Sequence, residues 1–224
     1  MILIGMFDSP FVRRVAVSMN VLGIAFEHRN WSVGKDFHLV RQFNPVGRVP
    51  SLILADGEAL VESSAILDFI DEYSGAAVPL LPKSGKDRRD ALRIMSLAIG
   101  AAEKGVAQLY ETAFRPAEKR HPPWTDRCRT QMQAALAEVD RIAQSRTGEW
   151  LIGNSLSQAD ITAACVFTFL SEALDVNRNE VYPGLAAITA RCEARREFSA
   201  SKAAFFPPGQ GGLDATLPPE GAPS

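Results

Sequence analysis

Residues 48–66, with the sequence RVPSLILADGEALVESSAI, contain the pattern that decides the fold. Residues 49–54 form a largely apolar run that is typical of a strand, and Asp56-Gly57 is a dipeptide typical of a tight turn. Residues 59–61 then supply an apolar partner strand. From residue 63 to residue 73 apolar side chains recur at helical spacing. This stretch therefore predicts an antiparallel hairpin that runs directly into a helix.

The residues before this stretch complete an α/β sheet. Residues 1–6 are a short apolar run that indicates a buried strand. Ser9-Pro10 is a strong helix start, and residues 12–22 carry apolar side chains at three- and four-residue steps. Residues 25–29 predict a second strand and residues 37–43 a short helix. The order strand, helix, strand, helix, hairpin, helix indicates a sheet with helices packed against its faces.

The composition divides the chain into two domains and a tail. Residues 74–84 are rich in glycine, proline and serine and indicate a linker. Beyond it, to about residue 200, the apolar spacing is helical throughout. The tail is rich in proline and glycine, which favours poor order. We expect an α/β domain over residues 1–77, an all-helical domain over residues 84–204 and a poorly ordered tail over residues 205–224.

The first long helix of the second domain carries two apolar stripes. One steps by three and four residues: Leu92, Met95, Ile99, Ala102, Val106, Leu109 and Ala113. A second stripe lies beside it: Ala91, Ile94, Ala98 and Ala101. One stripe can face the core while the other faces a partner subunit. The alternative is that both stripes belong to the core of a single chain.

A further helix is predicted to be buried on all sides. Residues 161–170 contain no charged side chain. Ser157 and Asp160, just before them, have the spacing of a capping box. We interpret this feature as purely structural, and its loss should cost roughly 1 kcal/mol or more.

Charge, hydropathy and cysteine usage exclude several classes of protein. The 224 residues carry a net charge of −2, so no basic field is available for nucleic acid or an anionic membrane. No run of about 20 apolar residues is present. The apolar start, residues 1–7, is too short for a secretory signal. Cys128, Cys165 and Cys192 form no C-x-x-C pair, which argues against a disulfide framework or a zinc site. We expect a cytoplasmic protein without a metal.

The first candidate site is residues 7–14, FDSPFVRR, where a strand turns into a helix. Backbone N–H groups at a helix N-terminus attract negative charge. A thiolate placed there would be favoured, and the hydroxyl of Ser9 could donate a hydrogen bond to it. The same pattern also fits a serine that only caps its helix.

Two more junctions have the residue types of a binding site. The Val49-Pro50 bond, just before a strand, can be cis and can turn a backbone edge toward a ligand. The alternative is a trans proline that starts an edge strand. At the next strand-to-helix junction, Ser63 could hold a carboxylate and Glu62 an ammonium group. Alone, this pair also fits a helix cap beside a surface acid.

Taken together, these pieces resemble the cytosolic glutathione transferase family. The resemblance rests on S-P-F-V-R, N-P-x-G-x-V-P, E-S-x-A-I and S-x-A-D in this order, and it extends over about residues 1–200. The S-P-F-V-R start is most similar to bacterial serine-type transferases and to the plant tau class. The resemblance implies a thioredoxin-like α/β N-terminal domain followed by an all-α C-terminal domain.

The resemblance also implies roles for the residues in these motifs. Ser9 would stabilise the thiolate of glutathione. Pro50 would be a cis-proline, and the backbone of Val49 would pair with the cysteinyl part of glutathione. Glu62 and Ser63 would hold its γ-glutamyl group.

Other positions are implied for the rest of the substrates. Arg48, with Lys35 or His38, matches positions for the glycyl carboxylate. Phe11 is expected at the glutathione site, facing the second substrate. Residues expected in the second-substrate pocket, between the two domains, are Tyr110, Phe114, Arg115 and Trp124. The alternative for each of these is core packing.

The function implied is attack by the glutathione sulfur on a small electrophile, with glutathione as co-substrate, in a homodimer. The second apolar stripe is consistent with a dimer. Serine at position 9, with no cysteine nearby, disfavours activities that need a glutathionylated protein cysteine. Two alternatives remain open. One is a non-catalytic binding or regulatory protein, similar to the stringent starvation protein. The other is a glutathione-dependent disulfide reductase or peroxidase.

Overall fold

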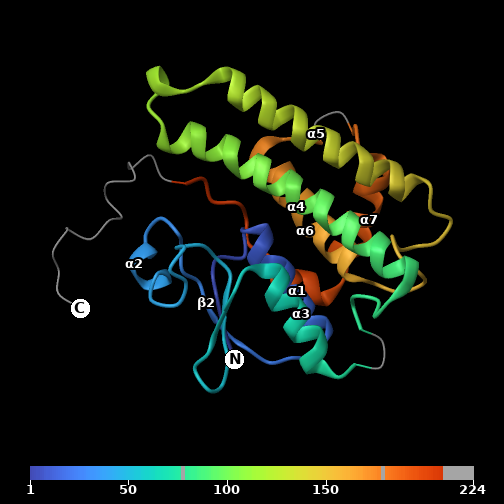
Figure 1. Cartoon of the computed structure of the whole chain (residues 1–224). Coiled ribbons are helices and arrows are strands. Elements are labelled where there is room, and N and C mark those ends of the chain that lie inside the picture. The colour runs from blue at the N-terminus through green and yellow to red at the C-terminus, as the bar shows by residue number, and fades with distance from the viewer. Residues whose placement is uncertain (77–78, 178–179, 209–224) are drawn as a thin grey trace.

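The structure of the chain, a computed structural model, describes residues 1–76, 79–177 and 180–208 (Figure 1). Its strands are β1 (Ile2–Ile4), β2 (Glu27–Arg29), β3 (Ser51–Ile53) and β4 (Ala59–Val61). Its helices are α1 (Pro10–Val21), α2 (Phe37–Val40), α3 (Ser63–Ser74), α4 (Gly85–Phe114), the 3-10 helix Ala117–Lys119, α5 (Pro122–Gln144), α6 (Gln158–Leu174), α7 (Pro183–Glu193) and α8 (Arg196–Ser199).

The four strands form one mixed sheet in the order β2-β1-β3-β4. β1 and β2 are parallel, while β3 is antiparallel to both of its neighbours. The predicted hairpin is confirmed, with Ser51 opposite Val61. β3 starts one residue after Pro50, because proline has no N–H to donate to a strand ladder. β1 and β2 are also shorter than predicted, β4 has the predicted bounds, and the order of the strands is as expected.

Alternate side chains along the strands separate two layers of core. Leu3 and Leu52 point to one face, where they pack with α1 and α3. Ile4 and Ile53 point to the other face, where they meet Val40 of α2. This alternation is the consequence of the two-residue period of a strand. The sheet is therefore covered on both sides, and α1 lies in the layer that also contacts the helical half.

The helical half is built around α6. Figure 1 shows α4 and α5 running antiparallel beside one another, with α6 and α7 behind them. Almost every residue of α6 from Gln158 to Leu170 is buried, which confirms the prediction from its lack of charge. α6 also packs against α1, so it joins the two halves. The capping box is confirmed as well: Asp160 accepts hydrogen bonds from the backbone N–H of Ser157 at 3.0 Å and of Leu151 at 2.7 Å.

One expectation about α4 is wrong. The second stripe, offered above as consistent with a dimer surface, is buried in the core of its own chain, with Ala91 and Ala101 fully inaccessible. Its small side chains let α6 approach closely, and a Cβ on the neighbouring Gly105 would lie 2.3 Å from a methyl of Leu170. Part of the first stripe remains at the surface, where Leu92 is 39% exposed.

The remaining expectations concern cysteines, membrane segments and the tail. Cys128, Cys165 and Cys192 are all buried and free. Within the described ranges, no helix is both long and apolar enough to cross a bilayer. Residues 209–224, most of the predicted tail, lie outside the described part of the chain, so poor order there stays a prediction.

Candidate functional site

The start of α1 presents a hydroxyl at the N-terminus of a helix. Ser9 is the N-cap residue, in an extended conformation, and Pro10 occupies the first helical turn. The Oγ of Ser9 accepts a hydrogen bond from the backbone N–H of Val12 over 3.5 Å, which is long for such a cap. Accepting this bond leaves the hydroxyl hydrogen able to donate. The geometry can therefore offer an anion both an O–H donor and the positive end of a helix.

The loop before α1 lies directly against the Val49–Pro50 peptide bond, which is cis. Gly5 has φ +132°, and a Cβ there would lie 2.5 Å from a methyl of Val12 and 2.9 Å from Cβ of Val49. Only glycine allows this approach and this backbone conformation. The cis bond was implied by the resemblance, and the structure confirms it. It brings the backbone of Val49 beside the helix that begins at Ser9.

Arg48 joins the same region from the preceding loop. Asn44 holds this loop by donating from its side-chain amide to the carbonyl of Arg48 at 2.8 Å. The guanidinium carbon of Arg48 then lies 6.0 Å from the ring centroid of Phe11 on α1. A cation at this distance from a ring face is weakly attracted to it. The contact places Arg48 and Phe11 next to each other, on the side of α1 close to Ser9.

The third junction, at the start of α3, is held by hydrogen bonds of its own side chains. Glu62 has φ 72°, and its carboxylate accepts from the backbone N–H of Ser64 at 2.9 Å. The hydroxyl of Ser63 donates to the other carboxylate oxygen of Glu62 at 3.1 Å. Ser63 is almost fully buried. Its hydroxyl therefore stands at a helix N-terminus in a fixed orientation.

Sequence reasoning assigned no role to Arg14, which connects these junctions. Its guanidinium is fully buried and donates to the hydroxyls of Ser63 at 2.7 Å and Ser64 at 2.8 Å. It also reaches Thr162 of α6 at 3.3 Å. Burial lowers the pKa of Arg14 to about 10, although the charge of Glu62 opposes this shift. In the sequence, the one local hint of this role was that an arginine occurs among the apolar side chains of α1. Through it, α1, α3 and α6 form one block behind the site.

The second-substrate candidates of the helical half divide into two groups. Tyr110 packs edge-on against Phe114, with ring centroids 5.0 Å apart. Burial raises the pKa of Tyr110, while the charge of Arg48 lowers it and that of Asp8 raises it, so its hydroxyl is within electrostatic range of both. Tyr110 is therefore a residue of α4 whose hydroxyl is influenced by charges of the N-terminal half.

Arg115 and Trp124 are held on the helical side. Arg115 forms an ion pair with Glu111 at 2.8 Å. Lys104 lies over the ring of Trp124, 5.5 Å from its centroid. These contacts anchor both side chains to α4. Their expected part in the second-substrate pocket stays a prediction.

Two surface depressions lie away from this region. One, of about 410 Å³, lies between α1 and α8. Another, of about 250 Å³, lies between the start of α4 and the end of α5. The site is therefore assigned from the chemistry of its residues. In the part of the chain that the structure describes, no group of three or more histidine, cysteine or acidic side chains is placed to hold a metal ion.

Known proteins match both halves of the chain. A family model for the N-terminal domain of glutathione S-transferase matches residues 3–77, and one for the C-terminal domain matches residues 122–191. The GST-like protein YibF of Escherichia coli (strain K12) is 30% identical over 169 residues, 75% of this chain and 81% of YibF. Glutathione S-transferase U7 of Arabidopsis thaliana is 27% identical over 81% of this chain and 75% of its own length.

Solved structures agree with these sequence matches. The crystal structure of a glutathione S-transferase from Methylobacterium radiotolerans, in complex with glutathione sulfonate, superposes with a TM-score of 0.84. The two sequences are 29% identical, and the match covers 89% of this chain and 93% of that one. The mixed four-stranded sheet, the helical half and these matches agree. The chain belongs to the glutathione S-transferase family.

Proposed function

We propose that the protein is a glutathione transferase that joins the sulfur of glutathione to small electrophiles. The observation that carries the proposal is the hydroxyl of Ser9, at the N-terminus of α1, where its Oγ accepts a long 3.5 Å bond from the backbone N–H of Val12. An O–H donor combined with the positive end of a helix stabilises a thiolate. Each unit by which the thiol pKa falls corresponds to about 1.4 kcal/mol.

The reaction needs only substrates and positioned donors. The thiol of glutathione loses its proton to solvent, and the sulfur stays anionic beside Ser9. The sulfur then forms a bond to the electrophilic atom, and the leaving group departs with its electron pair. Holding the two reactants together supplies the rest of the acceleration, because proximity removes the entropy cost of their encounter. The protein's contribution is therefore to bind, to orient and to stabilise negative charge.

The remaining parts of glutathione are assigned to the other junctions. The backbone of Val49, set by the cis bond to Pro50, takes the cysteinyl unit. Glu62 and Ser63 take the ammonium and carboxylate of the γ-glutamyl unit, and Arg48 is near enough to attract the glycyl carboxylate. The buried arginine behind Ser63 supports this assignment, because it adds positive charge where a carboxylate would bind. The related structure with bound glutathione sulfonate supports the binding of glutathione itself.

The electrophile is assigned to the surface between the halves. Residues that would contact it are Phe11, Tyr110, Phe114, Arg115 and Trp124. We also propose that the protein acts in the cytoplasm as a homodimer. Exposed apolar side chains on α3 and α4, Tyr73 and Leu92, support a contact between two copies.

The test is the Ser9→Ala variant, with Ser84→Ala as its matched control. Ser84 is the N-cap residue of α4 and also lacks a short cap bond. Ser9→Ala should raise the pKa of bound glutathione, followed by thiolate absorbance, by about 1–2 units. Turnover at pH 6.5 with a chlorinated dinitroaromatic acceptor should fall accordingly. Full activity of Ser9→Ala under these conditions would contradict the role given to Ser9.

The same assay separates the alternative functions. A reductase or peroxidase would turn over a mixed disulfide or a hydroperoxide faster than any alkylating electrophile. A binding protein would take up glutathione in calorimetry and turn over none of them. The proposal requires conjugation to be the fastest of the three reactions.

A further inference from the structure

The turn that carries Ser9 is short and is fixed at its backbone. The N–H of Ser9 donates to the carbonyl of Met6 at 3.1 Å, so residues 6–9 form one turn between β1 and α1. Gly5, directly before the turn, is buried and has the positive φ described above. The torsion angles of these few residues determine where the hydroxyl of Ser9 stands at the start of α1. A group that holds this turn therefore also holds Ser9.

The imidazole of His28 contacts this part of the chain on both sides of Met6. Its Nε2 lies 2.7 Å from the carbonyl oxygen of Gly5. Its ring stacks on the ring of Phe7, with the centroids 3.8 Å apart and the two planes within 4° of parallel. One side chain from another strand thus bonds the backbone before Met6 and packs on the side chain after it.

The register of the sheet places His28 at this turn. β2, an edge strand of the sheet, runs parallel to β1, and His28 is opposite Leu3 (Figure 1). The N–H of Gly5 donates to the carbonyl of Arg29 at 2.9 Å, which extends the pairing to the start of the turn. Because side chains alternate between the faces of a sheet in step on paired strands, His28 lies on the face of Leu3, which α1 covers. Phe7 packs on the same layer of core, and the imidazole lies against its ring.

The contact with Gly5 requires a hydrogen-bond donor at position 28. A carbonyl oxygen can only accept, so Nε2 of His28 carries the hydrogen. The imidazolium and one neutral tautomer both meet this requirement, and the contact is therefore the same for either charge of the ring. Loss of the donor would leave the carbonyl of the buried Gly5 without this bond, which disfavours the present conformation of the turn.

From this arrangement we propose that His28 is a positioning residue for Ser9, because it holds the turn before α1 so that the hydroxyl of Ser9 faces the sulfur of glutathione. The inference rests on the proposed function and deepens it. His28 acts on the sulfur through the turn, by way of Gly5 and Phe7. A displacement of the hydroxyl by about 1 Å would weaken its bond to the thiolate, because such a donor must stand within hydrogen-bond distance of the charge. His28 therefore sets how far Ser9 lowers the pKa of the thiol.

The first experiment separates the two contacts by substitution at position 28. His28→Ala removes both, His28→Phe keeps a ring for Phe7, and His28→Gln keeps an N–H donor at a similar reach. The pKa of bound glutathione, followed by thiolate absorbance, should rise by about 0.5–1 unit in His28→Ala. It should stay within about 0.3 unit of wild type in His28→Gln, with His28→Phe between the two. The matched control is Glu27→Ala, which changes an exposed neighbour on the same strand and should leave the pKa unchanged. An unchanged pKa in His28→Ala would overturn the inference.

The second experiment combines His28→Ala with Ser9→Ala and measures turnover of 1-chloro-2,4-dinitrobenzene at pH 6.5. With Ser9 present, His28→Ala should lower kcat about 3- to 10-fold, the change in ionised thiol that the expected pKa shift produces, while KM for glutathione stays within about twofold. In the Ser9→Ala background the same substitution should have no further effect, because no hydroxyl remains to be positioned. A general loss of structure would lower turnover in both backgrounds. Equal effects of His28→Ala in the two backgrounds would contradict the positioning role.

A measurement on the protein without glutathione separates failure of this inference from failure of the proposed function. Hydrogen exchange of the Ser9 amide, which bonds to Met6, is followed by NMR in wild type, His28→Ala and His28→Gln. We expect exchange to be about 5- to 10-fold faster in His28→Ala and unchanged in His28→Gln. An exchange rate that is unchanged in His28→Ala overturns the inference even if conjugation is fast. Faster exchange together with a raised thiol pKa supports it even if no acceptor is turned over. If wild type binds no glutathione, both proposals fall.

Discussion

Ser9 and Asp8 are neighbours with opposite effects on an anion placed at the start of α1. The hydroxyl of Ser9 can donate to a thiolate, whereas the carboxylate of Asp8 repels it. Burial raises the pKa of Asp8, which shows that its negative charge is already disfavoured where it stands. The site therefore combines a donor that stabilises the sulfur anion with a charge that opposes it.

This opposition predicts the effect of removing the charge. Asp8→Asn should lower the pKa of bound glutathione by about 0.5–1 unit, because a like charge nearby disfavours ionisation. The pKa is followed by thiolate absorbance as pH is varied. Asp56→Asn, in the turn at the far end of the hairpin, is the control and should leave the pKa unchanged. An unchanged or higher pKa in Asp8→Asn would show that the sulfur binds away from Ser9.

At the scale of elements, α6 depends strongly on one side chain, that of Asp160. Asp160 accepts from two backbone N–H groups, those of Leu151 and Ser157, and from the hydroxyl of Ser157 at 2.6 Å. It is fully buried. Burial raises its pKa, and these hydrogen bonds oppose the shift. One carboxylate thus fixes both the start of α6 and the loop before it.

Asp160→Ala should therefore cost more than an ordinary helix cap. We expect the free energy of unfolding to fall by about 3 kcal/mol, since buried donors are left without partners in addition to the lost cap. Urea unfolding followed by circular dichroism gives this value. Ser84→Ala, which removes a cap residue without a side-chain cap bond, should cost less than about 0.5 kcal/mol. Similar losses in the two variants would show that Asp160 acts only as a cap.

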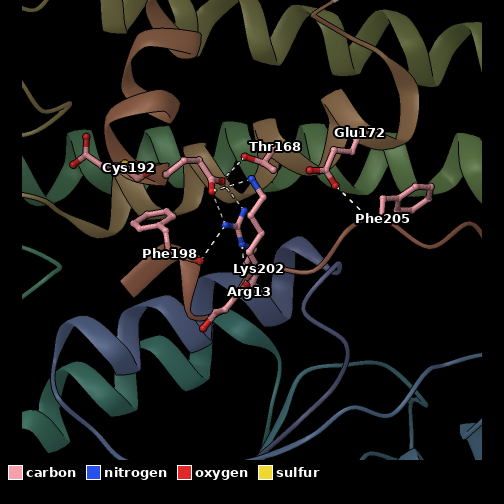
Figure 2. A network of polar contacts seen from close by, with 10 residues as sticks. Arg13, Thr168, Glu172, Cys192, Phe198, Lys202 and Phe205 are labelled. Carbon is pink, nitrogen blue, oxygen red and sulfur yellow. Dashed lines mark hydrogen bonds and ion pairs between the residues drawn. The ribbon is translucent and has the colours of Figure 1, made fainter. Parts of the chain in front are cut away.

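At the scale of the whole molecule, a partly buried ion pair fastens the two halves. Arg13 of α1 donates to both carboxylate oxygens of Glu193 on α7, at 2.7 and 2.8 Å (Figure 2). It also donates to the carbonyl of Ser201 at 3.0 Å. Burial would raise the pKa of Glu193, but the hydrogen bonds from Arg13 and Thr168 outweigh it, and the pKa lies below its usual value.

A lowered carboxylate pKa makes stability depend on pH in a defined direction. The contribution of Glu193 to the free energy of unfolding is complete above the pKa of an unfolded glutamate, about 4.3. It is lost as pH falls through the lower pKa that Glu193 has in the folded protein. Glu193→Gln should flatten the loss of stability between about pH 5 and pH 3, measured by urea unfolding at each pH. Glu138→Gln removes an exposed pair with Arg141 and is the control, since added salt should abolish its effect. An acid transition identical in Glu193→Gln and wild type would contradict the prediction.

The proposed dimer gives a second prediction at this scale. Tyr73 is 60% exposed and stacks on Phe69 of α3, while Leu92 is exposed on α4. A double variant, Tyr73→Glu with Leu92→Glu, should move the protein from dimer to monomer in sedimentation velocity, because charges in an apolar contact must be desolvated. Val181→Glu is the control, an equally exposed apolar position before α7. A dimer that persists in the double variant would place the contact elsewhere.

Much of the fold and the site could be predicted from local patterns. The hairpin of residues 48–66, the capping box of Ser157 and Asp160 and the uncharged α6 are signals within a few residues of each other, and all three are confirmed. The resemblance of the motifs implied the cis bond before Pro50. Turn dipeptides, caps and apolar periods determine these features because their physical cause is short-range.

The sequence did not show which stripe of α4 is buried, or that Arg13 and Arg14 lie inside the protein. Both depend on partners that are distant along the chain, such as Glu193 for Arg13 and Ser63 for Arg14. The contact between Phe206 and Asp8 spans almost the whole chain in the same way. The sequence by itself therefore determined the elements, their order and the residues that open each helix. Only the tertiary structure decided which charges are buried and which distant groups pair with them, because desolvation and pairing depend on which distant segments pack together.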